Sequence, residues 1–144
     1  MATILDAGPL IAALDQRDRH HEMCAEFFAR SREALIISPF VIAEVDHYSL
    51  TRLGVDVEIG SLRDVAAQTH VERIDNDDVQ RCADIAEQYR DLAIGIADAS
   101  IILLAERHDT DRIATLDRRH FRAFRSMRGN PFVLLPWDEG QRTE

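Results

Sequence analysis

Asp98 and Glu44 are acidic residues in segments whose pattern is otherwise apolar. Asp98 is the one charged residue in the segment LAIGIADASIILLA, residues 92–105. Glu44 lies four residues from both Phe40 and Tyr48, so a helix places it on the same face as these aromatic side chains. An ionised carboxylate removed from water costs several kcal/mol unless another group compensates it. Both acids are therefore expected to meet a partner from elsewhere in the fold.

Two further acids directly follow short apolar runs that are typical of buried strands. Asp6 follows TIL, and Asp117 follows IATL. Sites in open parallel sheets form outside the carboxyl ends of the strands, so these two acids are expected to meet there. Taken singly, each also has a structural interpretation: Asp6 as the N-cap of a helix that begins near Pro9, and Asp117 as a turn residue.

Four converging carboxylates must either protonate or hold a cation. The sequence contains no lysine, and no arginine lies beside the first three acids. A divalent metal is then the expected compensating charge, and all-oxygen ligation favours Mg²⁺, with Mn²⁺ as the alternative, over zinc. A zinc cluster of His20, His21 and Cys24 lacks a partner group and is rejected. Mg²⁺ held by carboxylates usually acts on phosphates, so the expected chemistry is phosphodiester hydrolysis.

Short apolar runs alternate with helical patterns along the chain, which predicts an α/β fold with a mainly parallel central sheet flanked by helices. At 144 residues we expect a single domain, 1–144. The expected strands are residues 2–5, 34–38, 71–74, 112–116 and 131–135. Asn76 or Asp77 is the expected cap of the helix that runs to about residue 90. The apolar face of the helix at residues 55–69, formed by Val55, Ile59, Leu62 and Ala66, packs either a partner or the core.

The charge is unevenly distributed along the chain. The formal net charge of −9 argues against a general polyanion binder, but residues 112–128 hold six arginines against one acid, a local charge of +5. This segment is interpreted either as a solvated surface helix or as a phosphate-contacting rim. The N-terminus lacks the pattern of a signal peptide, and no apolar run is long enough for a membrane span, so we expect a cytoplasmic protein.

The four acids and their surroundings resemble the PIN domain family, and within it the VapC toxins of bacterial toxin–antitoxin pairs. The matching stretches cover nearly the whole chain and are ILDAGPL, SPFVIAEVDH, IGIADASIILLAER and IATLDRRHF. The resemblance implies a PIN fold and a Mg²⁺-dependent endoribonuclease. It also implies inhibition by a cognate VapB-type antitoxin that covers the acidic site, and homodimerisation.

The resemblance also assigns roles to individual residues. Asp6 and Asp98 match the principal metal ligands, Glu44 the third acid and Asp117 the fourth, which acts directly or through water; Thr115 matches a hydroxyl residue that orients this acid. Many relatives have Ser or Thr directly after the first acid, whereas Ala7 and Gly8 follow Asp6 here, which puts a hydroxyl contribution from that position in doubt. From the charge pattern, the RNA backbone is expected to contact Arg118, Arg119 and Arg122.

The RNA target and one alternative function remain open at this stage. The stretch SPFVIAEVDHYSLTRLGVD resembles toxins that cut a ribosomal RNA loop, while other family members cut tRNA. The alternative is a catalytically silent PIN-like module that binds RNA or protein. Enzymes that form an aspartyl phosphate are disfavoured, because they rely on a lysine and the dehalogenase type needs a second Asp where Gly8 stands.

Overall fold

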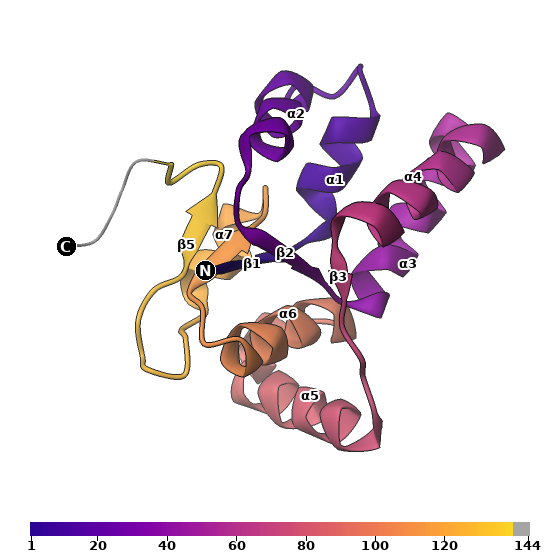
Figure 1. Ribbon diagram of the computed structural model, residues 1–144. Helices are drawn as coiled ribbons and strands as arrows, with labels where there is room; N and C mark the ends of the chain where they lie inside the picture. Colours follow the sequence, from indigo (N-terminus) through magenta and orange to yellow (C-terminus); the bar gives the residue numbers. More distant parts are fainter. Residues whose placement is uncertain (140–144) are drawn as a thin grey trace.

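A five-stranded sheet with only parallel strand pairs lies at the centre of the computed structural model, which describes residues 1–139 (Figure 1). The strands, in the spatial order β3-β2-β1-β4-β5, are β1 (Ala2–Leu5), β2 (Ala34–Ile37), β3 (His70–Val71), β4 (Arg112–Ala114) and β5 (Val133–Leu135). Leu5 pairs with both Ile37 and Ala114, so β1, β2 and β4 end at one edge of the sheet. The predicted α/β class is confirmed, and the sheet is parallel throughout the described residues.

Helices make the crossover connections that parallel strands require. They are α1 (Ala7–Leu14), α2 (His21–Arg30), α3 (Pro39–Tyr48), α4 (Val55–Gln68), α5 (Asn76–Gln88), α6 (Ile96–Arg107) and α7 (Arg118–Ala123), with the short turns η1 (Ser49–Leu53) and η2 (Arg90–Leu92). Figure 1 shows α1 and α2 paired above the sheet and α5 and α6 paired below it. The centre of α6 is almost fully buried, from Ala99 to Ala105. Among residues 1–139, each helix is too short or too polar to cross a membrane.

The helix that carries Asp98, α6, begins at Ile96, because Ala93 before it adopts a left-handed conformation (φ 50°). Several predicted boundaries were wrong by a few residues. The cap of α5 is Asp75, which forms a reciprocal capping box with Asp78, and not Asn76 or Asp77. The third strand covers only His70–Val71, earlier and shorter than expected.

The apolar face predicted for the helix at residues 55–69 points away from the core. Val55, Ile59 and Leu62 are exposed, whereas Ser61 and Val65 are the residues of α4 that are buried. These two residues lie four apart and mark the side of the helix that packs on the protein, which is turned by roughly a third of the circumference from the predicted apolar face. Of the two interpretations left open, packing into the core is therefore excluded for this face.

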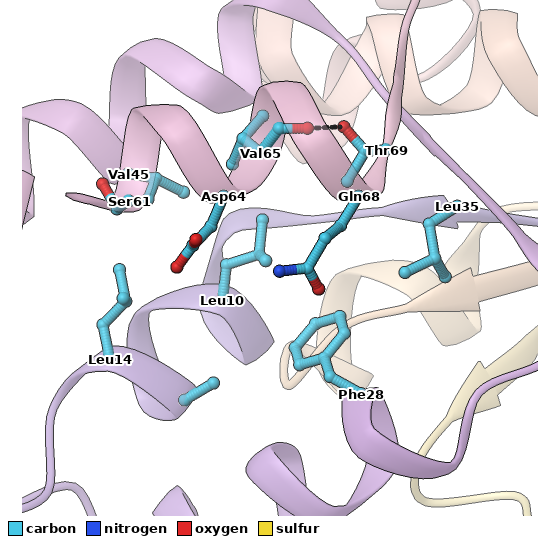
Figure 2. A pocket seen from close by; sticks show the side chains of 11 residues that line it. Leu10, Leu14, Phe28, Leu35, Val45, Ser61, Asp64, Val65, Gln68 and Thr69 are labelled. Carbon is cyan, nitrogen blue, oxygen red and sulfur yellow. Dashed lines mark hydrogen bonds between the residues drawn. The ribbon is translucent and has the colours of Figure 1, made fainter. Parts of the chain in front are cut away.

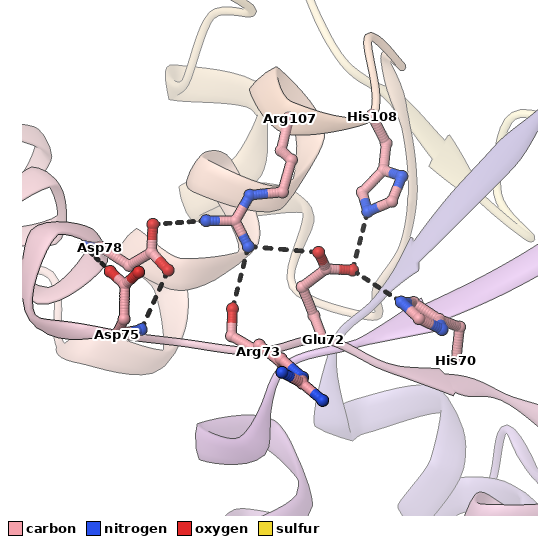
Figure 3. Close-up of polar contacts among 7 residues, drawn as sticks. All are labelled: His70, Glu72, Arg73, Asp75, Asp78, Arg107 and His108. Carbon is pink, nitrogen blue, oxygen red and sulfur yellow. Dashed lines mark hydrogen bonds and ion pairs between the residues drawn. The ribbon is translucent and has the colours of Figure 1, made fainter.

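A polar network around Glu72 ties β3 to α5 and α6 (Figure 3). Glu72 Oε2 lies 2.8 Å from His108 Nε2 and 3.2 Å from His70 Nε2, while Arg107 donates to Glu72 Oε1 at 3.2 Å and also pairs with Asp78. Burial acts to raise the pKa of Glu72, but the hydrogen bonds from His108 and Arg107 outweigh it and lower the pKa. The network stabilises the ionised carboxylate and fixes the connection that follows β3.

Candidate functional site

Asp6 and Asp117 are joined through one buried hydroxyl group. Thr115 Oγ1 donates to Asp6 Oδ2 at 2.7 Å and accepts from the backbone N–H of Asp117 at 3.0 Å. The Asp6 N–H donates to Ala114 O at 2.9 Å, which extends the pairing of β1 and β4 by one residue. The two strand ends therefore hold both acids in one place, as the sequence predicted, and Thr115 lies between them.

A pair of buried hydroxyl groups connects the helices that carry Glu44 and Asp98. Ser38 caps α3 by accepting from the Phe40 N–H at 3.2 Å. Its hydroxyl oxygen lies 2.7 Å from that of Ser100 on α6, and both serines are fully buried. Asp98 precedes Ser100 by two residues, so this contact fixes the start of α6 beside the start of α3. The two helices bring their acids toward the same end of the sheet.

The electrostatics show that the four carboxylates share one region. Burial, followed by the negative charge of Asp6 and then those of Asp117 and Glu44, raises the pKa of Asp98 to about 6, although His120 opposes this. Burial also raises the pKa of Asp6 despite the hydrogen bonds from Thr115 and Ala7, and Asp117 adds to this effect. Glu44 keeps exposed surface, but partial shielding from water by its neighbours, and then the charge of Asp6, raise its pKa. Mutual repulsion of this kind is typical of carboxylates that bind a cation or share a proton.

The position of Glu44 differs from the expectation. The side chain was placed on the apolar face of its helix, but Glu44 is exposed, and Val41 and Val45 are the buried residues of α3. The helical spacing from Phe40 and Tyr48 was misleading because both aromatic residues are only half-buried. Glu44 therefore reaches the other acids from the solvent side.

The donor set suits a hard divalent ion, since it consists of carboxylate oxygens with hydroxyl support. As the side chains lie, no three His, Cys, Asp or Glu residues among residues 1–139 stand within reach of one ion. A metal would therefore require rotation of the outer carboxylates, which the exposed Glu44 and the half-buried Asp98 are free to make. Asp6 and Asp117 are the acids whose carboxylates are held in place, each by two hydrogen bonds.

His120 is a site residue that the sequence analysis missed. Its Nδ1 lies 2.7 Å from Asp117 Oδ2, and its backbone N–H donates to Asp117 Oδ1 at 3.1 Å. In the tautomer that fits a carboxylate acceptor, His120 donates this hydrogen bond from Nδ1. Asp117 is therefore the N-cap of α7, and it also lies close enough to Asp6 for its charge to act there. The histidine three residues after the acid in IATLDRRHF was the available signal.

The hydroxyl group that contacts Asp6 does not come from the residues that follow it in the chain. Thr115, directly after β4, donates to Asp6, whereas Ala7 and Gly8 begin α1. A Cβ atom at Gly8 would lie 3.3 Å from Leu116 Cβ, so the start of α1 approaches the end of β4 closely. The small residue at position 8 is explained by this close approach.

The arginine-rich segment carries less free charge than its sequence suggests. Arg122 forms a bidentate ion pair with the buried Asp138, at 2.9 and 2.7 Å. The contact with RNA expected for Arg122 therefore competes with this ion pair. Arg118 stacks on Trp137 with its guanidinium carbon 4.1 Å from the ring centroid and keeps its charge. Arg119 is exposed and has no ion pair within residues 1–139. Arg118 and Arg119, directly after Asp117, are the better-placed cations.

A separate apolar pocket of about 210 Å³ lies between α1, α2 and α4 (Figure 2). Leu10 and Leu14 of α1, Phe28 of α2 and Val65 of α4 line it, and the Gln68 side chain reaches in between Leu10 and Phe28. None of the four acids contributes to its wall. It is therefore a second surface, suited to apolar side chains and distinct from the acidic site.

Comparison with known proteins identifies relatives over most of the chain. The PIN domain family matches residues 3–126. Ribonuclease VapC26 of Mycobacterium tuberculosis is 39% identical over 134 residues, which cover 92% of this chain and 99% of that protein.

Two solved structures are similar in fold at low sequence identity. M. tuberculosis VapC20, described as a toxin that cleaves the sarcin–ricin loop, has a TM-score of 0.75 at 13% identity and covers 83% of this chain and 92% of its own. VapBC2 from Rickettsia felis, bound to a promoter DNA fragment, has a TM-score of 0.64 at 15% identity, with 93% and 97% coverage.

Proposed function

We propose that this chain, which belongs to the PIN domain family as its motifs predicted, is a metal-dependent endoribonuclease that acts as the toxin of a toxin–antitoxin pair. The observation that carries the proposal is the convergence of Asp6, Glu44, Asp98 and Asp117. Beyond the effect of burial, the charge of Asp117 raises the pKa of Asp6, the charge of Asp6 raises that of Glu44, and the charges of the other three acids raise that of Asp98. The 39% sequence identity with a ribonuclease, over nearly the full length of both chains, supports RNA cleavage as the reaction.

Each acid has a role that follows from its position. Asp6 and Asp98 are the proposed principal ligands of Mg²⁺ or Mn²⁺, with Glu44 completing the set and Asp117 acting directly or through water. The bound ion supplies Lewis-acid stabilisation of the phosphate and lowers the pKa of a water molecule. Thr115 holds the Asp6 carboxylate and the Asp117 backbone in register, and His120 fixes the rotamer of Asp117. Arg118 and Arg119 contact the RNA backbone.

The direct test is RNA cleavage by the purified full chain with Mg²⁺, with Mn²⁺ and with EDTA. Cleavage is expected with either ion, and none with EDTA, with Asp6→Asn or with Asp98→Asn. Asp91→Asn, on the exposed turn η2, serves as the matched control and should cleave as the wild type does. Equal cleavage by Asp6→Asn, or cleavage in EDTA, would contradict the proposal.

The substrate class is proposed as structured RNA, either a ribosomal RNA loop or tRNA. Both are offered to the enzyme, and the new 5′ ends are sequenced to locate the cut. Arg119→Ala is expected to raise KM and to reduce the salt dependence of binding by about one phosphate contact, without changing kcat. The alternative, a catalytically silent PIN-like module, predicts RNA or protein binding with no metal-dependent cut in any of these RNAs.

A proposed antitoxin of the VapB type completes the assignment. Four mutually repelling carboxylates favour an inhibitor that presents a cationic side chain to them, and the pocket between α1, α2 and α4 offers room for its apolar side chains. Leu14→Asp in that pocket should weaken the complex without altering cleavage by the free toxin. Unchanged inhibition of this variant would remove the pocket from the interface.

A further inference from the structure

Three segments that are far apart in the sequence meet around Trp137, the single tryptophan of the chain. The guanidinium carbon of Arg118 lies 4.1 Å from the centroid of the Trp137 ring, and the imidazole of His20 meets Trp137 edge-on, with ring centroids 5.2 Å apart. His20 Nε2 also accepts a hydrogen bond from Arg19 Nε at 3.1 Å. These four residues, Arg19, His20, Arg118 and Trp137, form the Trp137 cluster.

The Trp137 cluster lies at the edge of the sheet that holds the acidic site. The backbone N–H of Thr115, the residue between the two strand-end acids, donates to Leu135 O at 3.0 Å, so β5 ends beside it. Trp137 follows Leu135 by two residues, and Arg118 directly follows Asp117. An RNA strand bound at the acids therefore passes close to Arg118.

The guanidinium of Arg118 has one covered face and one open face. At 4.1 Å it is close to van der Waals contact with the Trp137 ring, so no third plane fits between the two. The Arg118 side chain is nevertheless exposed, and no carboxylate within residues 1–139 pairs with it. The neighbouring Asp138 binds Arg122 with both oxygens instead. The outer face and the N–H edge of Arg118 are therefore open to a ligand.

The Trp137 ring serves as a platform and not as a hydrogen-bond donor. Its Nε1 is buried and has no acceptor in the part of the chain that the structure describes. A buried N–H without a partner costs stability, and a phenylalanine ring would avoid this cost. Tryptophan, however, has the aromatic face that attracts a cation most strongly. The residue type therefore suits the orientation of Arg118 better than it suits the packing of the core.

We propose that the Trp137 cluster is a subsite for one unpaired nucleobase beside the scissile phosphate, and that this base stacks on the outer face of Arg118. The inference rests on the proposed function, because the acids define where the RNA is cut. Unpaired RNA bases stack on arginine planes as well as on aromatic rings. The N–H edge of Arg118 stays free for the backbone contact proposed above. Trp137 is a positioning residue, because it holds the guanidinium plane in place from the protein side.

The chemistry of the Trp137 cluster favours RNA over an acidic segment of a protein. A carboxylate binds the N–H edge of a guanidinium and leaves its face uncovered. A nucleotide brings a planar base and a phosphate together, so it uses both the face and the edge of Arg118. Arg19 adds a second positive charge at the border of the cluster. An unpaired nucleotide is therefore the occupant that satisfies all the groups present.

The test compares two probes that carry the same phosphates, an unstructured RNA of about ten nucleotides and a ribose–phosphate oligomer of the same length without bases. Their binding to the full chain is measured by fluorescence anisotropy in EDTA, at one salt concentration. Wild type should bind the RNA about tenfold more tightly than the abasic oligomer, because only the RNA can stack.

Arg118→Lys keeps the charge but lacks the plane, so the preference for RNA should fall to about twofold or less while binding of the abasic oligomer stays unchanged. Trp137→Leu should lose the preference in the same way, and Trp137→Phe should keep most of it. Arg128→Lys is the matched control, since Arg128 is an exposed arginine of the same segment that pairs with Asp109. It should bind both probes as the wild type does, and circular dichroism verifies that each variant is folded.

Equal affinity of the wild type for both probes, including binding of neither, would overturn the proposal, as would a preference for RNA that survives Arg118→Lys. Tighter binding of a poly-aspartate peptide than of the RNA would assign the cluster to a protein partner and would also overturn it. The proposed nuclease is tested separately. A chain that prefers RNA but does not cleave it contradicts only the nuclease, and a chain that cleaves RNA but binds both probes equally contradicts only the subsite.

Discussion

Replacing Asp98 by Asn should make the fold more stable while it abolishes function. The pKa of Asp98 is raised from 3.8 to about 6, chiefly by burial and then by the charge of Asp6. Each tenfold change in proton affinity corresponds to about 1.4 kcal/mol, so ionising Asp98 at neutral pH costs the fold about 3 kcal/mol. Since the side chain is partly exposed, solvent screening reduces this to about 1–2 kcal/mol.

The pH dependence gives the sign of this effect. Below pH 3.8 the Asp98 carboxyl is protonated in both the folded and the unfolded protein, so it costs the fold no stability. Above about pH 6 it is ionised in both, and the full cost in stability is present. Urea unfolding at pH 7 should therefore show Asp98→Asn more stable by about 1–2 kcal/mol, and the difference should vanish near pH 3.5. The control Asp91→Asn should match wild type at both values. A variant that is less stable than wild type at pH 7 would refute the electrostatic account of the site.

Three further predictions concern residues that support the site or the fold. Thr115→Val should lower the free energy of unfolding by about 1–3 kcal/mol because the Asp6 carboxylate loses its donor, and Thr115→Ser should retain it, as measured by urea denaturation. Arg122→Met should destabilise the protein by about 2 kcal/mol by leaving the buried Asp138 unpaired, with unchanged RNA affinity in a filter-binding assay. Because the pKa of Glu72 is lowered from 4.5, its stabilising contribution is present above that value and lost below it; the stability difference between wild type and Glu72→Gln should therefore shrink between pH 5 and 3.

The sequence predicted the parts of the site that depend on strand ends. Asp6 and Asp117 each follow a short apolar run, and parallel strands end at one edge, so local pattern and topology together bring them close. Asp98 was identified by the cost of a charge in an apolar segment. These inferences needed only burial and chain direction.

Other features depended on contacts that no local pattern encodes. Glu44 was assigned to the wrong face because half-buried aromatic residues gave the same spacing as core residues. His120 escaped notice because its contact with Asp117 depends on where α7 begins. Arg122 was counted as a free cation because its partner, Asp138, lies after the last strand. Each difference arises from tertiary packing that overrides the local signal.

The central claim is that the four acids bind one or more divalent ions, and anomalous diffraction from crystals grown with Mn²⁺ tests it most directly. The account predicts an anomalous peak for Mn²⁺ at about 2.0–2.2 Å from carboxylate oxygens of Asp6 and Asp98. Crystals of Asp6→Asn should lack this peak. A wild-type crystal at millimolar Mn²⁺ with no peak between these carboxylates would contradict it, as would a peak that persists in Asp6→Asn.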